Sequence, residues 1–210
     1  MKQIFAQHKV CAILRNISPE HLTEYAEALY NGGIRVFEVA FNTQNAGDQI
    51  RLLVHKFGGN ALIGAGTVTT KERCLAAKEA GAQFFLTPSV CRITMDFCRK
   101  NQIPLLPGVL TPSDVLTCLE YDYKMMKLFP AGAFPENYIK SLKGPFEETE
   151  YVAVGGVSAQ NAGSYLKAGY IGVGIGSSLV PAEYIQKEQW GKIEGHVRKL
   201  TDGLRAESVG

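Results

Sequence analysis

The chain has 210 residues, which is enough for one substantial hydrophobic core and short for two domains. Its 46% of hydrophobic and 20% of charged residues are typical of a soluble globular protein. The 22 basic and 20 acidic side chains are interspersed and leave a formal net charge of +2, which argues against nucleic-acid or membrane partners. Because the N-terminal segment is too polar for a signal peptide and no run approaches membrane-spanning length, we expect a cytoplasmic protein.

The cysteines and histidines show no metal-ligand spacing. The five cysteines are odd in number and scattered without a CxxC pair, so we interpret them as reduced packing residues. The four histidines lie far apart, and none forms an HxH or HxxxH pair or a cluster with carboxylates. The sequence therefore predicts no metal site and no cofactor.

A short apolar, β-branched segment followed by a longer amphipathic segment recurs along the chain. The starts of the apolar segments lie about 20–26 residues apart, the length of one strand, one helix and two short loops. The predicted strands are VCAIL (10–14), VFEVAF (36–41), ALIGAG (61–66), QFFLT (83–87), IPLLPG (103–108), MMKLF (125–129), YVAVG (151–155) and YIGVGIG (170–176).

The segments between the strands carry helix-start and helix-stop signals. Pro at the first helical position and Gly at the end are typical of a helix, and Ser and Thr are good N-caps. Gly32 and Gly81 are the predicted ends of the first and third helices. The predicted starts are Ser18-Pro19, Thr70, Thr111-Pro112 and Ser158, and residues 182–206 are predicted to form a closing helix.

Eight apolar strands that alternate with helices predict a buried parallel sheet. Eight units in about 200 residues favour an α/β fold, a compact (β/α)₈ TIM barrel that forms a single domain over residues 1–210. A doubly wound open sheet is the structural alternative. Barrel enzymes place their active residues at the C-terminal ends of the strands, so the candidate site is sought there.

Two ionisable residues interrupt predicted core strands. Lys127 lies between large apolar residues in MMKLFPA, and Glu38 lies inside VFEVAF. Burial disfavours the charged ammonium and favours the neutral amine, the form that attacks a ketone, and a nearby carboxylate could move protons. The pair could equally be a structural ion pair. We regard Lys127 as the candidate nucleophile and Glu38 as its proton shuttle.

Other candidate residues lie at the ends of predicted strands. Arg15 closes the first strand and could bind a carboxylate or phosphate, or could simply be solvated. Thr67 ends the third strand and could contact a substrate or cap the following helix. AVGGVSAQN (153–161) and GVGIGSSLV (172–180) are predicted to lead strands seven and eight into helix N-termini, the usual phosphate corner of such barrels. The predicted phosphate donors are the backbone amides of Gly155, Gly156, Gly176 and Ser177.

Six segments, in order and at consistent spacing, carry a resemblance to a known family. The chain resembles the 2-keto-3-deoxy-6-phosphogluconate (KDPG) and 2-keto-4-hydroxyglutarate (KHG) aldolases over roughly residues 9–181. The segments are EVAFNT (38–43), IGAGTV (63–68), LTPS (86–89), PLLPGV (104–109), KLFPA (127–131) and AVGGVS (153–158).

The resemblance implies a class I aldolase, a carbon–carbon lyase that is barrel-shaped and usually a homotrimer. The family's imine-forming lysine corresponds to Lys127 and its glutamate proton shuttle to Glu38. The glycine pairs at the ends of strands seven and eight would hold phosphate. The expected partner is therefore a small phosphorylated keto acid.

The chain departs from the pattern of many gluconate-type members at two positions. Those members carry Arg where Asn42 stands and Thr where Val154 stands. The branch that cleaves 2-keto-3-deoxy-6-phosphogalactonate (KDPGal) is more similar here, but an A-[IV]-L-R strand without the second arginine also occurs in gluconate-cleaving members. We predict that Arg15 takes over carboxylate recognition and that Asn42 is free to contact a substrate hydroxyl.

The predicted reaction is reversible cleavage of a 2-keto-3-deoxy-6-phosphoaldonate, gluconate or galactonate epimer, to pyruvate and glyceraldehyde 3-phosphate. Such a cleavage needs an electron sink, and the absence of a metal-ligand cluster in the sequence favours an iminium ion over a metal. One alternative is an aldolase for unphosphorylated 4-hydroxy-2-oxoglutarate. Others are a phosphosugar isomerase or synthase barrel and a catalytically idle phosphometabolite-binding barrel.

Overall fold

The computed structural model describes residues 1–206. Each of its strands lies inside a predicted apolar segment or extends beyond it by one residue. The fifth segment gives two short strands because Pro107 lies between them and has no N–H to donate to a sheet. The strands are β1 (Val10–Leu14), β2 (Val36–Ala40), β3 (Leu62–Gly66), β4 (Phe84–Leu86), β5 (Leu105–Leu106), β6 (Gly108–Val109), β7 (Met125–Leu128), β8 (Glu150–Val154) and β9 (Gly172–Ile175).

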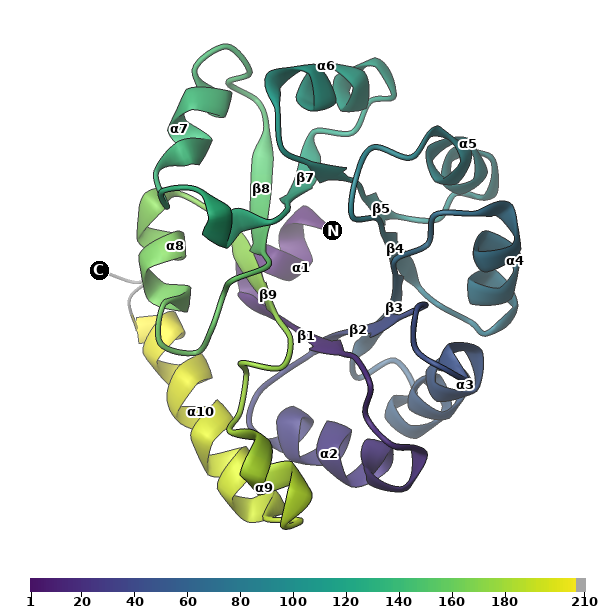
Figure 1. Ribbon diagram of the computed structural model, residues 1–210, viewed down its shortest axis with the longest axis vertical. Helices are drawn as coiled ribbons and strands as arrows, with labels where there is room; N and C mark the ends of the chain where they lie inside the picture. Colours follow the sequence, from purple (N-terminus) through teal and green to yellow (C-terminus); the bar gives the residue numbers. More distant parts are fainter. Residues whose placement is uncertain (207–210) are drawn as a thin grey trace.

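All paired strands are parallel, in the order β5-β4-β3-β2-β1-β9-β8-β7-β6. Because β5 and β6 are halves of one chain segment, the two ends of this order meet and the sheet closes. Figure 1 shows the resulting ring of strands inside a ring of helices. The predicted (β/α)₈ barrel is confirmed, and the alternative of an open sheet is wrong. The predicted single domain also spanned residues 207–210, which lie outside the described residues.

The helices cover the outer face of the barrel, and a short N-terminal helix that the sequence analysis did not predict lies across one end (Figure 1). The bounds are α1 (Lys2–Gln7), α2 (Pro19–Asn31), α3 (Ala46–Phe57), α4 (Lys71–Glu79), α5 (Arg92–Asn101), α6 (Pro112–Glu120), α7 (Tyr138–Lys143), α8 (Ala162–Ala168), α9 (Ala182–Gln186) and α10 (Trp190–Ala206), with a 3₁₀ turn at Ala131–Ala133. Among the described residues, no helix is both long and apolar enough to cross a membrane.

Apolar side chains form two separate clusters. The larger cluster lies between the strands and the surrounding helices, and the smaller one fills the interior of the barrel. Phe5 of α1 is fully buried in the interior cluster, together with Cys11, Val36 and Phe84. The helix α1 therefore closes the N-terminal end of the barrel and leaves the C-terminal end as the open mouth.

Several predicted helix starts are confirmed. The Thr70 hydroxyl accepts a hydrogen bond from the backbone amide of Arg73, and Thr111 forms a reciprocal capping box with Asp114. Ser18 is the N-cap of α2, with Pro19 at the first helical position, although its side chain makes no capping hydrogen bond.

Two helix predictions need correction. Ser158 does not begin a helix, because it forms a turn with Asn161, through reciprocal side chain–backbone hydrogen bonds of 2.7 and 3.3 Å, and α8 begins only at Ala162. The predicted closing helix over 182–206 is divided into α9 and α10. The reason is Glu188, whose φ of +51° is a left-handed conformation that a right-handed helix cannot contain.

Candidate active site

The strands β7 and β2 place a lysine and a glutamate together inside the barrel. Along β7, alternate side chains face opposite ways, and Lys127 points inward with Met125 and Phe129. Its Nζ lies 4.0 Å from Oε2 of Glu38, and the two side chains are only 6% and 1% exposed. Nζ also lies 5.2 Å from the centroid of the Phe129 ring. A buried ion pair of this kind brings an amine and a carboxylate into contact range.

Gly66, the last residue of β3, makes room for the carboxylate of Glu38. A Cβ atom at Gly66 would lie 1.7 Å from Oε1 of Glu38, so no other residue fits there without displacing the carboxylate. Among the described residues, Oε2 of Glu38 has no hydrogen-bond partner. A buried carboxylate oxygen without a hydrogen-bond donor is costly, which is typical of a functional group rather than of a stabilising one.

A cavity of about 490 Å³ opens above Lys127 at the mouth of the barrel. Its size suits a small metabolite. Most of the predicted site residues line it. The candidate nucleophile, the guanidinium of Arg15 and the two glycine loops therefore surround the same cavity. These residues are Arg15, Thr67, Lys127, Gly155, Gly156, Gly176 and Ser177.

Two of the predicted site residues do not line this cavity. Glu38 lies in the barrel interior, 4.0 Å from the amine of Lys127. Lys127 lines the cavity, whereas Glu38 does not. Asn42 lies beyond the end of β2 in a turn and is exposed. The side chain predicted to contact a substrate hydroxyl therefore stands outside the cavity wall in this structure.

Thr67 adopts an unusual backbone conformation at the end of β3. Its φ is +59°, which is rare for a β-branched residue and costs on the order of 1–3 kcal/mol. The N-cap of the following helix is Thr70, so the alternative interpretation of Thr67 as a helix cap is wrong. Strain of this kind is frequent at binding sites.

The loop after β8 contains two successive glycines with positive φ, +85° at Gly155 and +79° at Gly156. The neighbouring backbone is close, since the amide of Gly132 donates to the carbonyl of Gly155 at 2.7 Å. The Asn161 side chain donates to the carbonyl of Gly156 at 3.0 Å. Because successive backbone amides in a turn can point towards one place, this loop can form an anion-binding concavity.

The glycine loops do not run directly into helix N-termini, which corrects the sequence prediction. The helix α8 starts six residues after Gly156, and α9 starts five residues after Ser177. Turns occupy the intervening residues. The two loops are joined instead by the hydroxyl of Ser178, which donates to the carbonyl of Val157 at 2.7 Å. Backbone amides of the loops, rather than helix dipoles, are therefore the available anion ligands.

Sequence reasoning missed some residues of the cavity wall. Asn16 and Ser178 line it with polar groups, and Val154 lines it with an apolar one. Asn16 has a φ of +55°, and its backbone amide donates to the Thr43 hydroxyl at 3.4 Å. The sequence did contain a signal for this residue: an asparagine directly after the arginine at the end of a strand can adopt the left-handed conformation of a turn.

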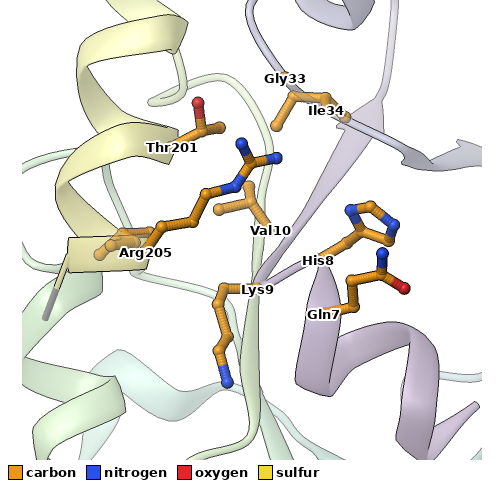
Figure 2. Close-up of a pocket in the computed structure, with 9 residues that line it drawn as sticks. Gln7, His8, Lys9, Val10, Gly33, Ile34, Thr201 and Arg205 are labelled. Atoms are coloured by element: carbon orange, nitrogen blue, oxygen red, sulfur yellow. The ribbon is translucent and has the colours of Figure 1, made fainter. Parts of the chain in front are cut away.

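A second, much smaller cavity lies at the opposite end of the barrel, between the start of β1 and the end of α10. Figure 2 shows His8 and the Arg205 guanidinium at its wall, with Gly33 and Thr201 nearby. Burial lowers the pKa of His8, and the charges of Arg35 and Arg205 lower it further. The cavity measures about 10 Å³, which is room for one water molecule at most, so it is too small for a substrate.

The fold and the site define a class of protein, a (β/α)₈-barrel enzyme with a buried lysine–glutamate pair at its mouth. The family model described as KDPG and KHG aldolase matches residues 1–196. The chain belongs to this aldolase family and is therefore a carbon–carbon lyase. The resemblance predicted from the six sequence segments is confirmed.

Known relatives and solved structures agree with the family. The KHG/KDPG aldolase of Escherichia coli K12 is 33% identical over 189 residues, which covers 89% of this chain and 87% of the relative. The 2-dehydro-3-deoxy-6-phosphogalactonate aldolase of the same strain is 33% identical over 172 residues, covering 81% and 84%. The crystal structure of KDPG aldolase from Legionella pneumophila, with pyruvate captured as a covalent carbinolamine intermediate, has a TM-score of 0.87 and 33% identity and covers 95% of this chain and 97% of that one.

Proposed function

We propose that the protein cleaves a 2-keto-3-deoxy-6-phosphoaldonate reversibly to pyruvate and glyceraldehyde 3-phosphate, with Lys127 as the imine-forming residue. The observation that carries the proposal is the buried Lys127 amine, 4.0 Å from Glu38, at the cavity of the barrel mouth. Relatives similar to this chain are named as aldolases for both the gluconate and the galactonate substrates, so the reaction follows from the family, whereas the epimer does not.

The lysine supplies the electron sink that the cleavage needs. Its neutral amine attacks the ketone carbon, and loss of water from the carbinolamine gives an iminium ion. The bond between the third and fourth carbons then breaks, its electron pair moves into the iminium to form an enamine, and the fourth carbon leaves as an aldehyde. Protonation of the enamine and addition of water release pyruvate and restore the amine.

Glu38 is the proposed proton carrier for these steps. Its carboxylate lies next to the Lys127 amine and is otherwise enclosed, so it can exchange protons with groups bound to that amine. It takes the proton of the substrate hydroxyl as the carbon–carbon bond breaks and returns a proton to the enamine. Before the substrate binds, the same carboxylate can accept a proton from the ammonium of Lys127.

The ends of the substrate are assigned to opposite walls of the cavity. Arg15 and Thr67 hold the carboxylate of the pyruvoyl end, because a guanidinium makes charge-assisted hydrogen bonds with carboxylates. The backbone amides of Gly155, Gly156, Gly176 and Ser177 hold the phosphate. Asn42 is proposed to contact a substrate hydroxyl, which requires its turn to close over the mouth.

An experiment on the imine tests the proposal directly. Sodium borohydride added with pyruvate reduces an iminium to a stable secondary amine, and peptide mass spectrometry should find the adduct at Lys127. Lys127→Ala should abolish both the adduct and pyruvate release. A matched control is Lys124→Ala, because Lys124 precedes the same strand but is exposed and paired with Glu148. An adduct at another lysine, or full activity of Lys127→Ala, would contradict the proposal.

The substrate is tested by comparing rates on four compounds. These are the phosphorylated gluconate and galactonate epimers, unphosphorylated 2-keto-3-deoxygluconate, and 4-hydroxy-2-oxoglutarate. We expect kcat/KM to be higher for a phosphorylated epimer than for either unphosphorylated compound. A preference for 4-hydroxy-2-oxoglutarate would instead support the second candidate function, which the family description also includes.

We also propose that the protein acts in the cytoplasm as a homotrimer. The cytoplasmic location is supported by the absence of a membrane-spanning helix among residues 1–206 and by a small-metabolite substrate. The trimer is supported by family membership and by large apolar side chains that are exposed on three neighbouring helices. These side chains are Leu75 on α4, Ile93 on α5 and Leu116 on α6.

A further inference from the structure

Three consecutive carbonyl groups after β3 each accept a hydrogen bond from a different side chain. Arg73 donates through Nη1 to the carbonyl of Thr67 at 3.0 Å, and to the Thr69 hydroxyl at 3.2 Å. The Thr94 hydroxyl donates to the carbonyl of Val68 at 2.6 Å. The Cys91 thiol donates to the carbonyl of Thr69 at 3.5 Å. The donors come from α4 and from the start of α5, so two helices anchor one loop.

The central anchor continues into a buried chain of hydrogen bonds. Thr94 is fully buried, and its hydroxyl oxygen accepts from the Cys74 thiol at 3.7 Å while donating to Val68. Burial raises the pKa of the Cys74 thiol, so the group stays protonated and remains a donor. A donor–acceptor chain in a low-dielectric interior polarises along its length and becomes stronger. The Val68 carbonyl is therefore fixed more firmly than a single surface hydrogen bond would allow.

The anchored loop is the one that contains the left-handed Thr67. A β-branched residue with a φ of +59° is disfavoured, and it persists only where the surroundings determine its backbone on several sides. Because the carbonyl of Thr67 and the next two carbonyls are held, the peptide planes on the C-terminal side of Thr67 cannot rotate freely. The Thr67 side chain is thereby kept at the wall of the large cavity while Val68 stays in the core.

We propose that Arg73, Thr94 and Cys91 are positioning residues that hold Thr67 in its left-handed conformation and so set the affinity of the site for the keto-acid end of the substrate. None of the three lines the cavity, so each acts through the loop and not by contact. The inference rests on the proposed function, because it takes Thr67 as a ligand of the pyruvoyl end.

The first test replaces the central anchor. Thr94→Val keeps the shape of the side chain and removes the hydroxyl, and Thr94→Ser keeps the hydroxyl. The readout is the pyruvate concentration that half-saturates borohydride trapping at Lys127. Loss of one anchoring hydrogen bond should raise this concentration roughly threefold to tenfold in Thr94→Val, and Thr94→Ser should restore most of the affinity.

Thr201→Val is the matched control for stability. Thr201 is also buried, and its hydroxyl donates to the carbonyl of Gly32 at 2.7 Å, but it lies at the opposite end of the barrel. Both valine variants should lower the melting temperature, and only Thr94→Val should weaken pyruvate binding. Equal half-saturation concentrations in the two variants would overturn the proposal.

A second variant keeps the test informative if Thr94→Val does not fold. Arg73 is only half-buried, and Arg73→Lys retains the charge but replaces the planar guanidinium, whose Nη1 donates to both acceptors, by an ammonium on a shorter side chain. We expect a twofold to fivefold rise in the half-saturation concentration, on the order of a partly lost hydrogen bond. Arg51→Lys is the control, because Arg51 is exposed on α3 and pairs with Asp48. No difference between these two variants would also overturn the proposal.

The double variant Thr67→Ala/Thr94→Val separates this inference from the proposed function. If Thr94 acts through Thr67, the double variant should bind pyruvate no more weakly than Thr67→Ala alone. If Thr67→Ala binds pyruvate normally, Thr67 is not a ligand and that part of the proposed function fails. If Thr67→Ala weakens binding while Thr94→Val matches Thr201→Val, only the positioning role fails.

Discussion

Glu38 keeps its place because position 66 has no side chain. A Cβ atom at Gly66 would lie 1.7 Å from one carboxylate oxygen and 2.4 Å from the carboxylate carbon. Gly66→Ala therefore forces the carboxylate away from Lys127. If Glu38 carries protons, kcat should fall by about 10²–10⁴, as it should in the isosteric variant Glu38→Gln. Steady-state pyruvate release and thermal melting of both variants are the measurements.

A glycine elsewhere provides the control for Gly66→Ala. Gly203 lies in α10, and nothing stands within 4 Å of the position that a Cβ atom would take. Gly203→Ala should keep full activity, because it lies in a helix far from the barrel mouth. Folded Gly66→Ala or Glu38→Gln protein with near-normal turnover would show that the glutamate only balances the charge of the lysine.

Arg15 and Asn42 occupy different positions relative to the cavity. The predicted roles, carboxylate recognition for Arg15 and hydroxyl contact for Asn42, therefore lead to different expected effects of substitution. Arg15 lines the cavity, and a charge-assisted hydrogen bond contributes roughly 1.5–3 kcal/mol, so Arg15→Ala should lower kcat/KM by roughly 10–200-fold. Asn42 does not line the cavity, so Asn42→Ala should change kcat/KM less than Arg15→Ala does. The measurement is kcat/KM on both phosphorylated epimers.

The variant Asn42→Arg tests epimer choice separately. If Asn42 contacts a substrate hydroxyl in the closed complex, an arginine should change the ratio of kcat/KM values for the two epimers. An unchanged ratio would reduce Asn42 to a spacer in the turn. A near-neutral Arg15→Ala would mean that carboxylate recognition does not depend on the guanidinium.

Single residues differ in how well a sequence reveals them. Lys127 and Glu38 could be singled out because a charge in an apolar strand contradicts the strand pattern, and alternation along the strand gives the direction of each side chain. The left-handed backbone of Thr67 could not be foreseen, because threonine rarely adopts it and the hydrogen bonds that hold it come from α4 and α5. Long-range anchors of this kind leave no local pattern.

At the scale of the elements, the loop between β8 and α8 depends on one asparagine. The Asn161 side chain donates to the carbonyl of Gly156 and accepts from the backbone amide of Ser158. Asn161→Ala releases both groups from the loop, so the proposed phosphate amides lose their fixed direction. We expect KM for the phosphorylated substrate to rise about threefold to tenfold, since one to two hydrogen bonds are lost.

Pyruvate itself lacks phosphate, which provides an internal comparison for this variant. Borohydride trapping of pyruvate by Asn161→Ala should need the same pyruvate concentration as the native protein. Asn101→Ala is a matched control. The Asn101 side chain also donates a hydrogen bond to a backbone carbonyl, that of Phe97, but it lies on the outer helix α5. If Asn161→Ala impairs pyruvate trapping and phosphorylated substrate equally, the loop is not a phosphate site.

Elements were predictable where local signals decide them. Apolar runs located all of the strands, and the capping residues Thr70 and Thr111 located two helix starts. The helix α1 was missed because its short segment has one deeply buried residue, Phe5, and depends on the barrel interior for its place. Ser158 misled the prediction of α8, because a serine can close a turn with a nearby asparagine as readily as it can cap a helix.

At the scale of the whole molecule, the number of strand–helix units predicted that the barrel closes, but it did not predict how side chains pack inside the barrel. Eight strand–helix units of similar length favour a closed sheet. The register pairs Glu38 with Gly64 and Ala40 with Gly66, yet the Glu38 carboxylate lies against Gly66, so strand pairing alone does not give the side-chain neighbours. A sequence shows the glycines, but only the folded sheet shows that Gly64 makes room for the Phe84 ring and Gly66 for the Glu38 carboxylate.

The outer surface leads to a prediction about assembly. Ile93 is 56% exposed and Leu116 is 53% exposed, and their helices α5 and α6 are neighbours in the outer ring (Figure 1). Large apolar side chains gathered on neighbouring helices are typical of protein–protein contacts. Sedimentation should give three times the mass of one chain for the native protein. The double variant Ile93→Glu/Leu116→Glu should sediment as a monomer, because its glutamates would be buried at the contact without partners.

The double variant Ile93→Val/Leu116→Met is the control, because it keeps apolar groups at both positions and should remain a trimer. The cavity residues all come from one chain, so a monomeric variant that stays folded should still form the borohydride adduct at Lys127. The melting temperature of the native trimer should fall on dilution, whereas that of the monomeric variant should not depend on concentration, since association stabilises the folded state by mass action. A native protein that sediments as a monomer, or a glutamate variant that stays trimeric, would show that these helices do not form the contact.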